Sequence, residues 1–172
     1  TREMNRRSDG YNGNLGIELY LAENTSWTNV INYRENTGHS PDHVDFYDYD
    51  ANRTLTSIRN RLNDLNNKGE DFSYATNFVQ KFKKDGHKLT FDASVSKNYN
   101  DNQSIITEKS LTSALTPVIT ERTQNNQQQN RHFIQTDYIL PFGKNNQLEL
   151  GYRADYSELI TDYKVDSLSN GI

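Results

Sequence analysis

The segment Asp48-Tyr-Asp-Ala-Asn52 has the D-x-D-x-N spacing that opens a calcium-binding loop. Arg53 stands where such a loop turns at a glycine, and Arg59 stands where its bidentate glutamate belongs. Both departures remove features on which calcium binding depends. A solvated acidic loop therefore explains this segment better than a calcium site.

His39 and His43 are four residues apart, a spacing that would place both imidazoles on one side of a helix. Pro41 lies between them and disfavours that helix. Asp42 and Asp45 are near enough in sequence to complete a metal site, but the pattern remains weak. We expect no metal ion and no cofactor.

Catalytic patterns are equally weak. Glu149 and Asp155 form an acidic pair of the kind used in general acid–base chemistry, with Arg153 beside them. Paired charge on a wet surface explains them better. The sequence has no Ser/His/Asp order, no phosphate-binding glycine loop and no HExxH motif. We expect no catalytic residues, and an enzyme is the least favoured class.

The amino-acid composition excludes several further classes of function and site. The 172 residues carry a formal charge of −4 and have no Lys/Arg cluster that could follow a phosphate backbone, which argues against a nucleic-acid partner. The mean hydropathy is −0.97, and only 33% of the residues are hydrophobic. Cysteine is absent, which removes disulfides and thiolate metal sites. Eleven tyrosines favour strands and membrane interfaces over deep cores.

Two-residue alternation is the main structural signal. In Leu148–Ser157, apolar side chains alternate with Glu149, Arg153, Asp155 and other small or polar residues. Six such segments group into three hairpins with short turns, of which Lys84-Asp-Gly86 is the strongest turn signal. The predicted strands cover residues 12–21, 26–34, 72–82, 88–99, 132–142 and 147–162.

Between the hairpins, residues 35–71 and 100–131 are long and polar, and we expect them to be outer loops. Short turns on one rim and long loops on the other are typical of outer-membrane β-barrels. Within the first loop, Thr54–Asn67 has apolar residues at helical spacing, so either a short helix or a strand extension is expected. The Asn/Gln tract 124–130 is expected to be mobile.

The alternation assigns side chains to two faces of a barrel wall. The charged set is expected to face the lumen, because lipid exposure of Arg or Lys costs about 2–4 kcal/mol at mid-bilayer. Its members are Glu18, Arg34, Asp92, Asp137, Glu149, Arg153 and Asp155. The apolar set is expected to face lipid and comprises Leu15, Ile17, Leu19, Leu89, Phe91, Val95, Ile134, Tyr138, Leu140, Leu148, Leu150, Tyr152 and Tyr156.

These segments resemble a known family. Gly10–Thr25, followed by Val30–Asn36, is similar to the barrel of TonB-dependent receptor-like outer-membrane proteins of the Bacteroidetes type. Phe133–Lys144 with Leu148–Arg153 resembles a recurring hairpin of those barrels. The resemblance implies a location in the bacterial outer membrane, a barrel of about 22 strands, a plug in the lumen and transport energised by TonB.

Six strands are fewer than the eight of the smallest barrels, so we expect the chain, residues 1–172, to be a partial barrel domain: an all-β, antiparallel up-and-down transmembrane segment. Its expected partners are outer-membrane lipid, the remaining strands and the plug, with TonB and a surface lipoprotein or other outer-membrane subunits as further candidates. The favoured function is import of a bulky nutrient. The alternatives are an accessory barrel subunit of an assembly or export complex and a soluble carbohydrate-binding β-sheet module.

Overall fold

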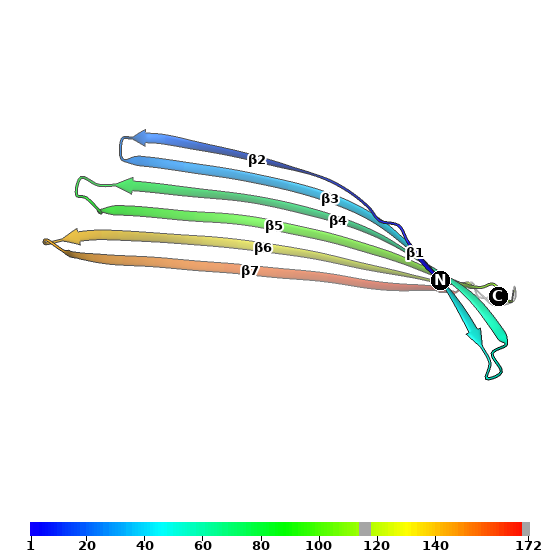
Figure 1. Ribbon diagram of the computed structural model, residues 1–172. Coiled ribbons are helices and arrows are strands. Elements are labelled where there is room, and N and C mark those ends of the chain that lie inside the picture. The colour runs from blue at the N-terminus through cyan, green and yellow to red at the C-terminus, as the bar shows by residue number, and fades with distance from the viewer. Residues whose placement is uncertain (114–117, 170–172) are drawn as a thin grey trace.

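The computed structural model describes residues 1–113 and 118–169, which form one antiparallel sheet (Figure 1). β1 and β2 lie end to end along one edge of β3, and β4 to β7 follow in chain order. This order confirms the predicted all-β, up-and-down fold. The strands are β1 (Arg2–Met4), β2 (Arg7–Ala22), β3 (Thr25–Tyr49), β4 (Leu55–Lys81), β5 (Lys88–Ser110), β6 (Ile119–Phe142) and β7 (Asn146–Ser169).

The three predicted hairpins are confirmed. They are β2–β3, β4–β5 and β6–β7, and their turns gather at one end of the sheet, which we call the hairpin end; the opposite end is the distal end (Figure 1). In the turn after β4, the His87 amide donates to the Lys84 carbonyl at 3.0 Å, and Gly86 has a φ of +77°. Glycine adopts this left-handed conformation without steric cost, which explains the Asp-Gly signal.

The long outer loops predicted over residues 35–71 and 100–131 are wrong. Residues 35–49 continue β3 and residues 55–71 belong to β4, so the connection between them is the short turn 50–54. Likewise, residues 100–110 continue β5 and residues 119–131 belong to β6. Residues 114–117 of the second predicted loop lie outside the described residues. Alternation ends where both faces become polar, but the backbone hydrogen-bond ladder continues regardless of side-chain polarity.

Two smaller expectations fail for the same reason. Residues 55–67 lie in β4, so the helix predicted over Thr54–Asn67 is wrong and the alternative of a strand extension is confirmed. The Asn/Gln tract 124–130, expected to be mobile, lies in β6 and is paired on both sides; Asn126, for example, pairs with Asp101 in β5 and Asp162 in β7. None of the described residues form a helix long and apolar enough to cross a membrane.

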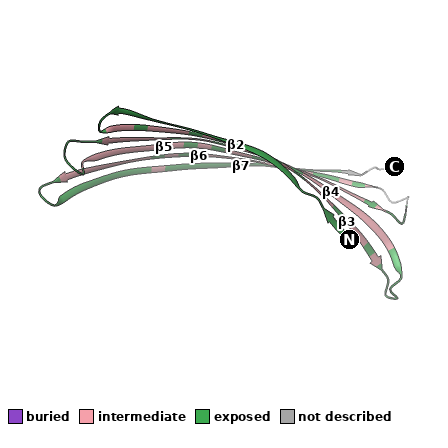
Figure 2. Ribbon diagram, turned by 45° about the horizontal axis from the view of Figure 1, so that its top comes forward, coloured by how far each residue is buried: buried purple, intermediate pink, exposed green. Residues whose placement is uncertain are grey.

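The sheet is a single layer and has no buried hydrophobic side chain among its described residues. Figure 2 shows intermediate and exposed residues along its strands. Large apolar side chains are instead exposed, including Leu15 at 61%, Leu150 at 57% and Tyr152 at 62%. A sheet face of this kind must be covered by something other than the chain's own residues, because exposed apolar surface in water is unfavourable.

Candidate functional site

The strand register sorts the predicted residues onto two faces. Directly paired residues share a face of an antiparallel sheet, and side chains alternate along each strand. We name the two sides the Leu15 face and the Glu18 face. All thirteen residues predicted to meet lipid lie on the Leu15 face, and all seven charged residues predicted for the lumen lie on the Glu18 face. Contact with lipid and with the lumen stays a prediction at this point.

Apolar side chains on the Leu15 face form a band next to the hairpin end. In β4 and the turn after it, the band runs from Phe72 to Phe82, ten residues along the chain. At about 3.3 Å per residue this distance is about 33 Å, and at the usual barrel tilt of roughly 35–45° it spans about 25 Å. That height equals the apolar band of outer-membrane barrels, roughly 25 Å. The strands continue well beyond it toward the distal end.

Aromatic side chains mark the distal rim of the band. Tyr11 and Tyr33 pack with ring centroids 6.0 Å apart, and Phe72 is paired with Tyr33 across the β3–β4 ladder. The Tyr11 hydroxyl donates to Glu35 Oε2 at 2.7 Å, and the Tyr33 hydroxyl donates to the same oxygen at 2.9 Å. Lys68 Nζ lies 3.6 Å from Glu35 Oε1. Rings on the apolar side with hydroxyls on the polar side are typical of a membrane interface.

A second aromatic group marks the rim at the hairpin end. The Phe82 and His87 rings stack with centroids 4.0 Å apart, and Tyr138 meets the Phe82 ring edge-on at 6.5 Å. His87 Nε2 lies 2.9 Å from the Tyr138 hydroxyl. The sequence placed Tyr138 among the apolar residues, but its contact with His87 became apparent only from the structure.

Behind the apolar band, the Glu18 face is polar. Asn32 Nδ2 donates to Ser73 Oγ at 3.1 Å, and Asn77 Nδ2 donates to Asp92 Oδ1 at 2.6 Å. A hollow of about 440 Å³ lies along this face, and Arg34, a residue predicted to face the lumen, contributes to its lining. Its other lining residues are Asn12, Gly13, Asn14, Asn32, Tyr33, Asp71, Phe72, Ser73, Ser96, Asn98 and Arg131. Such a surface suits water on this side.

The charged residues of β7 pair locally. Arg153 Nε donates to Asp155 Oδ2 at 2.9 Å, and the Arg153 guanidinium lies 5.1 Å from the centre of the Phe133 ring. Glu149 and Asp155 are six residues apart in one strand, about 20 Å at roughly 3.3 Å per residue. Carboxyl pairs that work together in glycoside hydrolysis lie about 5–10 Å apart. These two side chains are therefore too far apart for that chemistry.

The weak metal-site patterns have local structural explanations. Asp50 Oδ1 accepts hydrogen bonds from the backbone amides of Asn52 and Thr54, both at 2.8 Å, which closes the tip of the β3–β4 hairpin. His39 Nε2 lies 2.6 Å from Asp64 Oδ1 across the ladder. Within residues 1–113 and 118–169, no three His, Cys, Asp or Glu side chains gather in a way that could hold a metal ion.

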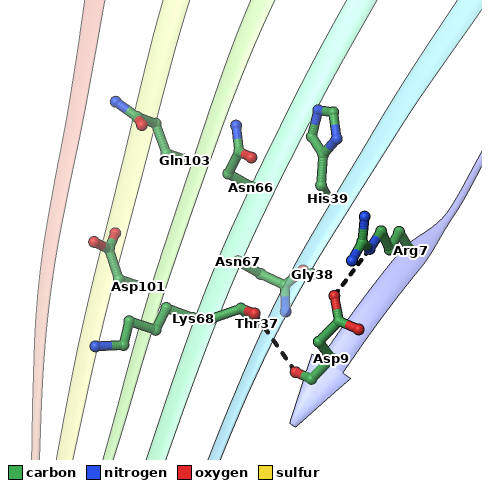
Figure 3. A pocket seen from close by; sticks show the side chains of 10 residues that line it. All are labelled: Arg7, Asp9, Thr37, Gly38, His39, Asn66, Asn67, Lys68, Asp101 and Gln103. Atoms are coloured by element: carbon green, nitrogen blue, oxygen red, sulfur yellow. Dashed lines mark hydrogen bonds and ion pairs between the residues drawn. The ribbon is translucent and has the colours of Figure 1, made fainter.

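Beyond the band, the Leu15 face becomes charged. A hollow of about 450 Å³ lies here between Arg7, Asp9, His39, Lys68 and the neighbouring strands (Figure 3). Arg7 Nε donates to Asp9 Oδ2 at 3.0 Å, and Lys68 pairs with Glu70. Hydrogen bonds from the Tyr11 and Tyr33 hydroxyls hold the pKa of the Glu35 carboxyl below its ordinary value of 4.5. These charges are therefore largely paired with one another.

The sequence pattern did not predict that the distal halves of the strands belong to the sheet. On the Glu18 face they carry Asn36, Asn67, Asn100 and Asn102. A usable signal was present in β5, because the amides Asn98, Asn100 and Asn102 alternate with Tyr99 and Asp101. Alternation of amides against other polar residues is also a period of two, although no apolar residue takes part.

Comparison with known proteins agrees with this geometry. A family model described as "Outer membrane protein beta-barrel family" matches residues 80–172, more than half of the chain. None of the curated proteins compared with the chain matches it. The matched region holds the β4–β5 turn, β5, β6 and β7, and thus much of the apolar band. The chain therefore belongs to the outer membrane protein beta-barrel family and lies in the bacterial outer membrane.

Proposed function

We propose that this chain is part of the barrel wall of a TonB-dependent receptor-like protein, of the type found in Bacteroidetes, that imports a bulky nutrient. The observation that supports this most is the division of one sheet into an apolar face and a hydrophilic face at the same height. Leu19, Phe91 and Tyr152 face one side of the membrane-height segment, while Asp92 and Arg153 face the other. A hydrophilic face at that height suits a solvated lumen.

The open sheet supports a large barrel. In an eight-stranded barrel, six neighbouring strands would wrap around most of the circumference. Here β2 to β7 lie side by side in an open sheet instead (Figure 1). No pairing joins β7 to β1 or β2 within the described ranges, so both edges offer unpaired backbone groups. Further strands must cover these edges, because lipid cannot satisfy open backbone hydrogen-bonding groups. A large barrel leaves room for a plug.

Glycine positions support the Glu18 face as the inner one. A Cβ added at Gly151, on the Glu18 face, would lie 2.8 Å from Asp137 Oδ1. A Cβ added at Gly13, on the Leu15 face, would meet nothing within 4 Å. Side chains converge on the concave side of a curved sheet and spread on its convex side. Crowding on the Glu18 face thus favours that side as the lumen.

The proposal is tested by nutrient uptake in cells. Cells that carry the whole protein should lose growth on its nutrient when the gene is deleted, and should lose it equally when TonB is deleted while the barrel remains. Restored TonB should restore growth. If deletion of the barrel abolishes growth and deletion of TonB leaves it unchanged, transport energised by TonB is wrong.

The alternative, an accessory barrel subunit of an assembly or export complex, is favoured by the length of the strands. β3 to β7 contain 23–27 residues, and a transmembrane strand needs only about 9–11. The surplus forms a stiff polar surface beyond the membrane, suited to contacts with other subunits. Crosslinking from Asn66 and Gln103 on that surface tests this alternative, since the accessory role requires a stable protein neighbour when no nutrient is present.

A further inference from the structure

Lysines gather at the hairpin end of the sheet. The chain has nine lysines, and five of them, which together we call the lysine cluster, lie in the β4–β5 and β6–β7 turns or directly beside them: Lys81, Lys83, Lys84, Lys88 and Lys144. The three turns at this end carry only two carboxylates, Glu23 and Asp85. The hairpin end is therefore cationic, although the whole chain has a net charge of −4.

Two hydrogen bonds hold the three turns beside one another. The backbone amide of Lys81 donates to the Asn24 carbonyl at 2.8 Å, which joins the end of β4 to the β2–β3 turn. Lys84 Nζ donates to the Pro141 carbonyl at 2.8 Å, which joins the β4–β5 turn to the end of β6. The lysine cluster therefore forms one continuous surface along the rim.

The ammonium groups of the lysine cluster lack opposite charges. Among the described residues, none of the five forms an ion pair, whereas Lys68 and Lys164, beyond the apolar band, both do. Lys81 and Lys88 are also the last directly paired residues of the β4–β5 ladder. Like charges directly opposite each other in a sheet are unfavourable. An anionic partner at the hairpin end would offset this repulsion.

The position of the lysine cluster beside the apolar band indicates the chemistry of that partner. Lys83 and Lys84 are exposed and come directly after Phe82, which belongs to the aromatic group at this rim. A hollow of about 410 Å³ lies here, lined in part by Lys81, Phe82 and Lys83, with Glu23 as its one acidic residue. Cations directly beside apolar surface match a phospholipid, whose phosphate lies next to its acyl chains. An acidic protein segment would have no use for the apolar surface.

We propose that the lysine cluster binds the phosphate of anionic phospholipids in the leaflet that meets the hairpin end. Outer-membrane barrels have their short turns on the periplasmic side, so this is the periplasmic leaflet. Lys83, Lys84 and Lys144 contact the headgroups from the turns, and the long side chains of Lys81 and Lys88 reach them around the rim. The inference goes beyond nutrient import, because it depends on the position of the hairpin end in the membrane and not on transport.

The test is lipid retention by the whole protein. The protein is reconstituted with equal amounts of phosphatidylglycerol and phosphatidylcholine and extracted in a neutral detergent, and the retained lipids are counted by mass spectrometry. At low ionic strength we expect phosphatidylglycerol to be retained at least about fivefold more strongly, which corresponds to about 1 kcal/mol. Added salt should weaken this preference, because it screens the charges. Equal retention of the two lipids at low ionic strength overturns the inference.

Charge-removing variants locate the binding surface. Lys83→Gln combined with Lys84→Gln removes two positive charges but keeps a donor for the Pro141 carbonyl, and the preference should fall to about twofold or less. Lys109→Gln combined with Lys164→Gln is the matched control, since it changes the net charge equally in the distal halves of the strands, and it should keep the full preference. Retention of phosphatidylcholine should be the same in both variants, which shows that the wall is intact. An undiminished preference in the first variant, or an equal loss in the control, overturns the assignment.

Two further probes separate lipid from other anions. Inorganic phosphate that replaces chloride at the same ionic strength should leave the preference unchanged, because free phosphate has no acyl chain to contact Phe82. If it abolishes the preference, the lysine cluster is a site for free phosphate and the lipid assignment is wrong. Labelled oligoglutamate should not bind the protein in competition with phosphatidylglycerol. If it binds through Lys83 and Lys84 while the two lipids are retained equally, the partner is an acidic protein segment and the inference is overturned.

Discussion

Asn77 in β4 donates a hydrogen bond of 2.6 Å to Asp92 in β5, directly beside the Phe78–Phe91 pair on the opposite face. One residue of displacement along each strand therefore separates a polar contact from an apolar one. This relationship fixes the register of the β4–β5 hairpin, because a slip of one residue would exchange the two environments. It recurs in β7, where Arg153 and Asp155 alternate with Tyr152 and Tyr156.

Phe91→Arg should destabilise the protein by about 2–4 kcal/mol, the cost of placing Arg at mid-bilayer on the lipid face. Phe91 lies in the middle rows of the apolar band, between Leu89 and Val95. Ser94→Arg is the matched control in the same strand, but on the Glu18 face, and should change stability by less than about 0.5 kcal/mol. The measurement is reversible urea unfolding in lipid vesicles. Equal destabilisation by both variants would contradict the assignment of faces.

The sequence predicted the hairpins and the faces because both depend on apolar alternation. Leu148–Ser157 alternates fully, and the structure places its two sets of side chains on opposite faces. The turn at Gly86 was also predictable, since its φ of +77° suits glycine. Where apolar and polar side chains alternate, the sequence alone predicts both the strand and the face on which each side chain lies.

The distal half of β6 could not be predicted in this way. In residues 124–130 every side chain is an amide, so both faces have the same polarity and no period is visible. The pairing of these residues depends on β5 and β7 at their sides, which continue the ladder begun in the apolar band. The hydrogen-bond ladder extends into this segment because the register is already set in the apolar band. That is a tertiary effect, and local strand propensity does not predict it.

Acidification should break the contact at the distal rim of the band. The pKa of Glu35 is lowered by hydrogen bonds from Tyr11 and Tyr33, so its carboxylate stabilises the fold fully above about pH 4.5. This stabilisation is lost as the pH falls below 4.5 through the lowered pKa. The ¹³C NMR signal of the Tyr11 ring should report that titration. In Glu35→Gln the titration should be absent; if it persists, another group causes it.

Arg53→Gly should stabilise the tip of the β3–β4 hairpin by about 0.5–1 kcal/mol. Arg53 has a φ of 64°, a left-handed conformation that costs a non-glycine residue roughly 1–2 kcal/mol, while glycine adds about 0.5–1 kcal/mol of chain entropy. The difference favours glycine. Amide hydrogen exchange at Asp50, whose amide donates to the Thr54 carbonyl at 2.9 Å, should slow. Arg53→Lys keeps the strain and should leave the exchange rate unchanged; faster exchange in Arg53→Gly would contradict the prediction.

Trp27, the single tryptophan of the chain, offers a direct measurement of which face meets lipid. It lies on the Leu15 face, paired with Leu19 and Phe78, and its indole nitrogen donates to Thr76 Oγ1 at 2.7 Å. Brominated phospholipids quench indole fluorescence on contact, so they should quench Trp27 strongly in reconstituted protein.

The control moves the fluorophore by one residue. In Trp27→Phe combined with Thr28→Trp, the indole lies on the Glu18 face, and brominated lipid should quench it weakly while water-soluble acrylamide quenches it well. Any tryptophan elsewhere in the whole protein is replaced by phenylalanine in both variants. Strong lipid quenching at position 28 and weak quenching at position 27 would reverse the two faces. The Glu18 face would then meet lipid, and its assignment as the lumen side would be wrong.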